Sequence, residues 1–227
     1  ILTDATADFA FALLMAAARR VVEGERYVRE GKWRTWGPSL LLGPDIHGAT
    51  LGLIGFGRIG QAMAKRAQGF DMRVLYYDPT QPCCDPAVDA SPADLETLLG
   101  ESDFVSVHTP LIAETRGMIN RERLALMKPT AVLINTARGP VVDPAALYEA
   151  LSEGRIFAAA LDVTDPEPIS LDSPLLTLDN IIIVPHIASA SVATRQKMAL
   201  MAAQNLLAGV RRERLPNCVN LEVYAGK

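Results

Sequence analysis

Three ionisable side chains stand in separate loops of this sequence, and each has its own chemical use. Arg138 lies in Asn-Thr-Ala-Arg-Gly, Glu167 in Asp-Pro-Glu-Pro and His186 in Val-Pro-His-Ile-Ala. An arginine presents a planar fork of donors to a carboxylate or a carbonyl oxygen. A histidine gives and takes protons near neutral pH, and a neighbouring glutamate can hold its charged form. His186 alone would count as an ordinary loop residue, but the three together predict acid–base chemistry on a small oxygen-rich molecule.

A glycine-rich turn gives a second chemical signal. The run Gly-Phe-Gly-Arg-Ile-Gly at 55–60 follows an apolar segment and opens a helical one. Gly55 allows the tight turn, Gly57 the close approach of a pyrophosphate, and Gly60 the packing of helix on strand. Asp78 ends the next apolar segment, where a carboxylate can accept both hydroxyls of an adenosine ribose and would repel a 2′-phosphate. The pattern predicts dinucleotide binding with NAD favoured over NADP; the alternative is an acid that only starts a turn with Pro79.

The elements that must position these groups alternate between strand and helix. The strands are continuously apolar, which is typical of a parallel sheet covered on both faces, and the alternation indicates a doubly wound α/β fold of the Rossmann type. Arg138, Glu167 and His186 then fall at or beyond the carboxyl ends of strands, where such sheets bind ligands. We predict strands at 50–54, 72–77, 104–107, 131–134, 158–161 and 181–184, and helices at 58–70, 121–127, 144–151 and 191–210.

Two Pro-containing signals predict where helices begin. Asp143 before Pro144 reads as a cap followed by proline in the first turn, and Ser91 before Pro92 reads in the same way.

Both ends of the chain lie outside this rhythm. Residues 4–22 place Phe9, Leu13, Leu14, Ala17 and Val21 on one face of a helix, and 23–44, with Trp33 and Trp36, reads as an extended arm. We divide the chain into a dinucleotide-binding domain at 1–190, whose helix and arm occupy 1–48, and a second part at 191–227.

Composition narrows the function further. The 227 residues carry a net charge of −4, which gives no electrostatic footprint for nucleic acid or an anionic membrane surface. No apolar run reaches the length of a membrane span. The three cysteines, Cys83, Cys84 and Cys218, have neither disulfide nor zinc spacing, so we expect a reducing cytoplasm and no metal.

The remaining candidates carry weaker signals. We expect His47 at the surface, His108 in a backbone-supporting role, and Cys83 and Cys84 in a surface loop rather than as nucleophiles.

The motifs in their order resemble the D-2-hydroxyacid dehydrogenases. The glycine run at 55–60, Asn-Thr-Ala-Arg-Gly at 135–139, Asp-Val-Thr-Asp-Pro-Glu-Pro at 162–168 and Pro-His-Ile-Ala-Ser at 185–189 all match, and the glyoxylate/hydroxypyruvate reductase branch is the most similar. The resemblance implies that Arg138 orients a 2-oxo acid, His186 protonates its carbonyl oxygen and Glu167 supports His186. It implies a cofactor site made of Gly55, Gly57, Arg58, Ile59, Gly60, Asp78, Thr109, Pro110, Thr115, Thr136, Ala137, Arg138, Asp162, His186 and Ala188.

The family also implies an assembly. Its helix and arm, here 1–48, build a homodimer, and its last helix returns to a flavodoxin-like substrate domain formed mostly by an upstream segment. We therefore expect this chain to lack that segment and to bind cofactor more readily than it turns over substrate.

Related activities stay open at this stage. Phosphoglycerate and phosphite dehydrogenases share the same three residues, whereas a formate dehydrogenase would carry Gln in place of Glu167. A different class, the NADH-sensing corepressor-like binding proteins, also shares the fold and differs by lacking robust turnover of 2-oxo acids.

Overall fold

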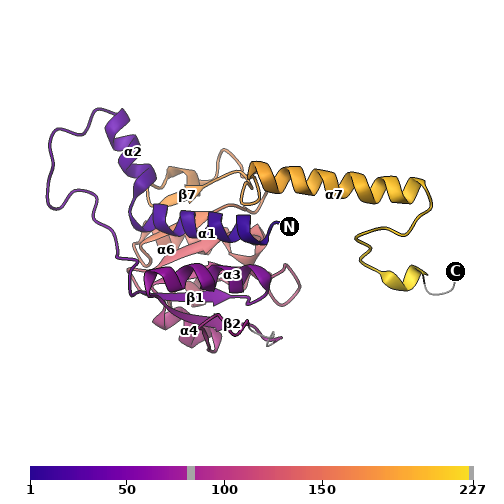
Figure 1. The fold of residues 1–227 in the computed structure, drawn as a ribbon. Coiled ribbons are helices and arrows are strands. Elements are labelled where there is room, and N and C mark those ends of the chain that lie inside the picture. The colour runs from indigo at the N-terminus through magenta and orange to yellow at the C-terminus, as the bar shows by residue number, and fades with distance from the viewer. Residues whose placement is uncertain (81–84, 225–227) are drawn as a thin grey trace.

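A seven-stranded parallel sheet organises the chain (Figure 1). The computed structural model describes residues 1–80 and 85–224, so Cys83 and Cys84 lie outside the described residues. The strand order is β3-β2-β1-β4-β5-β6-β7, which makes the sheet doubly wound, the fold class that the sequence predicts. The strands are β1 (Thr50–Ile54), β2 (Arg73–Tyr77), β3 (Ser91–Pro92), β4 (Phe104–Val107), β5 (Val132–Asn135), β6 (Ala158–Leu161) and β7 (Ile181–Ile183).

Helices cover both faces of this sheet. The α-helices are α1 (Thr3–Ala18), α2 (Val21–Arg29), α3 (Arg58–Ala67), α4 (Leu95–Glu101), α5 (Arg121–Leu124), α6 (Pro144–Ser152) and α7 (Val192–Val210). Short 3-10 turns occupy η1 (Gln68–Phe70), η2 (Gly139–Val141), η3 (Pro174–Thr177) and η4 (Leu221–Tyr224).

Alternation along each strand creates two separate cores. On β5, Val132 and Ile134 pack with α1 and α3, whereas Leu133 packs with α4, α5 and α6 on the other face. Because successive side chains of a strand point to opposite faces, a continuously apolar strand serves both cores at once. The sheet is thus held rigidly from both sides, and its carboxyl edge provides a fixed platform for loops.

The segment around residue 91 corrects one prediction. Ser91 and Pro92 form the edge strand β3 beside β2 instead of starting a helix. An edge strand tolerates proline because one side of its backbone needs no partner in the sheet. Asp94 is the true cap of α4, and its carboxylate accepts the Thr97 N–H at 2.8 Å. The other signal is confirmed, since Asp143 caps α6 with Pro144 in its first turn.

The N-terminal helix ends earlier than predicted. Arg20 takes a left-handed conformation with φ of 51°, which interrupts the helix and separates α1 from α2. Leu13 and Leu14 are buried as expected, but Val21 lies past the break and is exposed. Residues 23–29 of the predicted extended arm are helical as part of α2, which buries none of its residues.

Two segments of the chain project from the body of the molecule. Figure 1 shows α2 and the segment after it leaving one end of the molecule, and α7 leaving the other. Only Thr194 and Ala208 of α7 are buried. None of the described helices is long and apolar enough to cross a membrane.

Candidate active site

A cavity of about 510 Å³ opens at the carboxyl edge of the sheet. The loops after β4, β5, β6 and β7 meet there with the N-terminal turn of α1 and the start of α3. Of the residues predicted from the sequence, the cavity brings together Ile59, Thr109, Pro110, Thr136, Ala137, Arg138, Asp162, His186 and Ala188. The topology therefore gathers residues that the sequence spreads over well over a hundred positions.

His186 and Glu167 form a direct pair. The imidazole Nδ1 lies 2.5 Å from the Glu167 Oε1. His186 has a left-handed backbone with φ of 52°, an uncommon conformation for a residue with a side chain. The ring faces the large cavity, and a second cavity of about 390 Å³ is lined by both members of the pair. With Nδ1 directed at the carboxylate, Nε2 is the nitrogen available for a proton transfer in the cavity.

Asp162 fixes the loop that carries His186. Its carboxylate is buried just beyond β6 and accepts the N–H groups of Ile187 at 2.7 Å and Ala188 at 2.9 Å. Its main-chain oxygen accepts the N–H of His186 at 2.9 Å. Burial raises the pKa of the Asp162 carboxyl, and these two N–H donors and the nearby imidazole oppose that rise only in part. Three hydrogen bonds from one residue thus define the path of residues 186–188.

Arg138 presents its guanidinium at the cavity. The residue is exposed, and its Nη1 donates to the Ala137 carbonyl at 2.6 Å. Within residues 1–80 and 85–224, no carboxylate forms an ion pair with it. The next residue, Gly139, packs so closely that a Cβ would lie 1.9 Å from the Thr164 carbonyl oxygen. The loop of Arg138 and the loop that leads to Glu167 are therefore in contact.

The glycine turn leaves room where an anion would sit. A Cβ on Gly60 would lie 2.3 Å from the Gly55 oxygen, so this glycine serves packing of the helix on the turn. A Cβ on Gly57 would meet nothing within 4 Å. Gly57 is also the cap residue of α3, and no side chain caps that helix. The first N–H groups of α3 thus stay open to an anion at a position where the helix dipole favours negative charge.

Asp78 lies in a separate hollow beside the glycine turn. This hollow, of about 470 Å³, is also lined by Tyr77 and Pro79. The carboxylate accepts the Phe56 N–H at 2.8 Å and both the N–H and the hydroxyl of Thr80. Burial alone would raise the pKa of Asp78, but these hydrogen bonds outweigh it and hold the pKa below its usual value. The carboxylate is thus ionised and next to the turn, as the ribose prediction requires.

Several predicted cofactor residues do not line the large cavity. Gly55, Gly57, Arg58 and Gly60 form the turn beside it. Thr115 is buried, and its hydroxyl donates to the Pro110 carbonyl at 2.6 Å. It therefore supports the loop that lines the cavity.

One buried polar atom indicates that the cavity is built for a ligand. The Thr136 hydroxyl oxygen has no hydrogen-bond partner within the described part of the chain, although it is buried at the cavity. Buried polar atoms are rarely left unpaired in native structures. This hydroxyl, the open start of α3 and the ionised Asp78 together fit a nicotinamide dinucleotide. In the described residues, no group of three His, Cys, Asp or Glu could hold a metal ion.

The sequence did not lead us to every residue of the cavity. Leu2 and Thr6 come from α1 and the residue before it, and Thr6 is a buried polar residue on an otherwise apolar face, a signal that could have been noticed. His108 also lines the cavity, and its Nε2 lies 2.9 Å from the Ser106 hydroxyl. Burial lowers the pKa of His108 to about 4, so its ring is neutral. Leu111 and Ser189 complete the lining.

The doubly wound sheet, the open glycine turn and the His–Glu pair together define a nicotinamide-dependent dehydrogenase domain. Residues 11–188 match the model of a protein family that is described as "D-isomer specific 2-hydroxyacid dehydrogenase, NAD binding domain". The chain belongs to the D-isomer-specific 2-hydroxyacid dehydrogenase family.

Known relatives agree with this assignment. A glyoxylate reductase of Korarchaeum cryptofilum is 57% identical over 225 residues, which cover 98% of this chain and 68% of the relative. A crystal structure of a Thermus thermophilus protein matches with a TM-score of 0.91 at 55% identity, covering 96% of this chain and 68% of that one. A D-lactate dehydrogenase with NAD+ from Lactobacillus jensenii matches with a TM-score of 0.82 at 34% identity, covering 95% and 68%.

The family places the chain among the NAD-dependent oxidoreductases that reduce 2-oxo acids. The relatives are longer than this chain, and they favour this activity over the phosphoglycerate, phosphite and corepressor-like alternatives.

Proposed function

We propose that this domain reduces a small 2-oxo acid of the glyoxylate or hydroxypyruvate type with NADH, and that Arg138, Glu167 and His186 carry the reaction. The observation that carries the proposal is the His186–Glu167 pair at 2.5 Å, whose imidazole lines the same cavity as Arg138. The names of similar proteins, glyoxylate reductases among them, support the choice of substrate.

Arg138 would bind and orient the 2-oxo acid. Its guanidinium has no carboxylate partner among the described residues, so its donors can take a substrate carboxylate or carbonyl oxygen. A planar fork fixes the direction of the oxygen as well as its position, which a lysine would not do. The carbonyl is thereby polarised and held where a proton donor can reach it.

His186 would deliver the proton. Nε2 gives its proton to the carbonyl oxygen as the carbonyl carbon is reduced, and the product is a 2-hydroxy acid. Glu167 contacts Nδ1, so that the ring faces the substrate with Nε2. Solvent then returns the proton to His186.

Different residues of the cofactor site would bind different parts of NADH. Bound NADH supplies the hydride that reaches the carbonyl carbon. The start of α3 with Gly57 takes the pyrophosphate, and Asp78 takes the ribose hydroxyls, which favours NADH over NADPH. Thr109, Pro110, Thr136 and Ala137 line the path between them and His186.

The test is a turnover assay on the full-length protein, with any residues that precede Ile1. NADH and NADPH oxidation are followed with glyoxylate, hydroxypyruvate and pyruvate. We expect rapid NADH-dependent reduction of glyoxylate or hydroxypyruvate and much slower use of NADPH. Tight NADH binding without reduction of any 2-oxo acid would contradict the proposal and turn attention to phosphite or to an NADH-sensing role.

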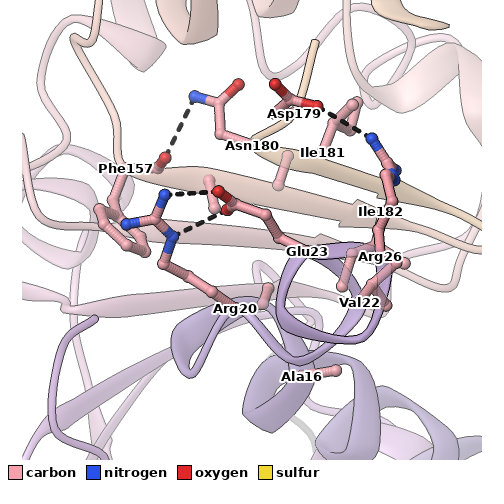
Figure 2. Close-up of a pocket in the computed structure, with 13 residues that line it drawn as sticks. Ala16, Arg20, Val22, Glu23, Arg26, Phe157, Asp179, Asn180, Ile181 and Ile182 are labelled. Carbon is pink, nitrogen blue, oxygen red and sulfur yellow. Dashed lines mark hydrogen bonds and ion pairs between the residues drawn. The ribbon is translucent and has the colours of Figure 1, made fainter. Parts of the chain in front are cut away.

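A second copy of the chain would cover the N-terminal surface. The helix α2 buries none of its residues, and Val28, Trp33 and Trp36 are exposed. Beside α2, at the amino ends of β6 and β7, lies a small cavity of about 160 Å³ (Figure 2). Its charged groups are already paired, Arg20 with Glu23 and Arg26 with Asp179. Its free lining is therefore mostly apolar, which suits a homodimer built through residues 1–48.

Two further assignments stay predictions. We assign residues 191–227 to a second, flavodoxin-like substrate domain, which is supported by how little of α7 packs on the sheet. We also expect a cytoplasmic protein without nucleic-acid or membrane partners, which is supported by the cysteine usage and the acidic charge.

A further inference from the structure

A buried amide stands directly beneath the loop of Arg138. Asn135 is the last residue of β5, and only 1% of it is exposed. Its Oδ1 accepts the Ala137 N–H at 3.0 Å, and its Nδ2 donates to the main-chain oxygen of Arg138 at 3.0 Å. One side chain thus satisfies two main-chain groups of a three-residue loop.

These bonds act on the backbone from which the guanidinium extends. The Arg138 side chain is exposed and contacts only its neighbour's carbonyl by hydrogen bond within the described residues. Little else therefore fixes its direction except the backbone at 137 and 138. A shift of that backbone would move the guanidinium by a comparable or larger distance, because the side chain is long.

Asp162, which follows the neighbouring strand β6, has a role similar to that of Asn135. Asp162 follows β6 in the sheet and holds the loop of His186 through two N–H groups. The two residues are linked, since the Asp162 N–H donates to the Asn135 main-chain oxygen at 2.9 Å. The loop after β7, which carries His186, needs two acceptors, whereas the loop after β5 needs one acceptor and one donor. A carboxylate suits the first, and an amide, which both accepts and donates, suits the second.

We propose that Asn135 is a positioning residue for Arg138, which sets the guanidinium where it meets the 2-oxo acid. The inference rests on the proposed role of Arg138. It adds that the Asn135 amide holds the backbone from which the Arg138 side chain extends. Asn135 itself touches neither substrate nor cofactor in this assignment.

The amide and the carboxylate can be distinguished by substitution. Asn135→Asp keeps the acceptor for the Ala137 N–H but places an oxygen against the Arg138 carbonyl oxygen, which breaks one bond and adds repulsion. Asn135→Ala removes both bonds and leaves two buried main-chain groups unpaired. Asn180→Ala is the matched control, because Asn180 donates to the carbonyls of Leu151 and Phe157 near the amino ends of the strands, away from Arg138. Figure 2 shows its bond to Phe157.

The experiment is a double-mutant cycle on the full-length protein. We measure kcat and KM for glyoxylate, and NADH affinity by fluorescence, in Asn135→Asp, Asn135→Ala, Arg138→Lys and the combined variants. We expect kcat/KM for glyoxylate to fall about ten-fold or more with Asn135→Asp, while the NADH Kd changes less than about three-fold. In the Arg138→Lys background the same substitution should cost less than about three-fold, because the oriented fork is already lost.

The outcomes separate this inference from the function on which it rests. If the fold-losses in kcat/KM of Asn135→Asp and Arg138→Lys multiply in the double variant, Asn135 acts independently of Arg138, and the inference is overturned. The inference would also be overturned if Asn180→Ala lost as much activity as Asn135→Asp at an equal melting temperature. The effect of Asn135 would then be a general structural one and not a positioning of Arg138. An Arg138→Lys variant with unchanged kcat/KM would instead refute the role of Arg138. If Asn135→Ala does not fold, Asn135→Asp, which keeps one bond and the side-chain volume, decides the question.

Discussion

The Glu167 carboxylate and the His186 ring are in direct contact. The Glu167 Oε1 lies 2.5 Å from the His186 Nδ1, so the carboxylate holds the ring in the orientation that leaves Nε2 for the substrate. Glu167→Gln keeps the shape but replaces the carboxylate with an amide, which no longer specifies which ring nitrogen carries the proton. We therefore expect kcat to drop roughly ten-fold or more. The measurement is kcat and kcat/KM for glyoxylate at a fixed neutral pH.

Glu153→Gln is the control for that variant. Glu153 also pairs with a cation, Arg155, but it follows α6 far from the cavity lining. The kcat of this variant should match that of the wild type. An unchanged kcat in Glu167→Gln would remove Glu167 from its role in supporting His186.

His108 predicts a pH dependence of stability. Its pKa in the folded chain is about 4 because of burial, below the ordinary value of 6.5. Between these values the unfolded chain binds a proton that the folded chain does not, so the free energy of unfolding falls as pH decreases from about 6.5 to about 4. His108→Gln should remove part of that slope. The check is the melting temperature of the wild type and of His108→Gln across this pH range, and equal slopes in the two proteins would contradict the prediction.

The site could be predicted where residue type and strand ends coincide. Arg138 and His186 were identified because each follows an apolar strand, and parallel strands end at one edge. Thr6 was missed because it reaches the cavity through the packing of a helix far away in the sequence. The internal bonds of Asp78 and Asn135 were also missed, since hydrogen bonds within loops depend on backbone paths that spacing does not specify.

At the scale of elements, two glycines in the turn between β1 and α3 serve different purposes, Gly57 in cofactor binding and Gly60 in stability. Gly57→Ala adds a methyl group that meets no protein atom, so the melting temperature should change by less than about 2 °C. The same methyl group would stand where we place the pyrophosphate, so the NADH Kd should rise about ten-fold or more. Gly60→Ala forces a methyl group against the Gly55 oxygen and should lower the melting temperature by several degrees.

Thermal melting and NADH titration of the two variants provide the check. Normal NADH binding by Gly57→Ala would place the pyrophosphate elsewhere. A normal melting temperature in Gly60→Ala would show that the turn can relax.

Most element boundaries followed the sequence, but four helix ends did not. The predicted helices at 58–70 and 121–127 end at Ala67 and Leu124, and the other two differences lie at α4 and α1. The strands at 50–54, 104–107 and 158–161 were predicted to the residue because buried parallel strands are short apolar runs between turns. The start of α4 was misplaced because Ser91 and Asp94 are both good caps, and pairing with β2 decided between them. The end of α1 was misplaced because nothing in the local spacing signals the left-handed Arg20.

At the scale of the whole molecule, the exposed apolar surface of residues 1–48 predicts a dimer. Trp36 is 78% exposed, which is costly for an aromatic side chain unless a partner covers it. Trp36→Glu should shift the protein from dimer to monomer and raise the dissociation constant about a hundred-fold or more. Sedimentation velocity over a range of concentrations measures this.

Leu126→Glu is the comparison, because Leu126 is a partly exposed apolar residue away from residues 1–48. It should leave the dimer intact. A wild-type protein that stays monomeric at all concentrations would contradict the dimer altogether.

The loop beyond β7, which carries His186, has a thermodynamic consequence. Asp162 fixes residues 186–188 through three hydrogen bonds made within the chain itself. The conformational entropy of ordering that loop is therefore lost when the chain folds, and a ligand that arrives later does not have to supply it. Binding strength at this edge of the sheet then reflects the contacts formed, and the cost of holding His186 in its left-handed conformation is borne by the stability of the folded domain.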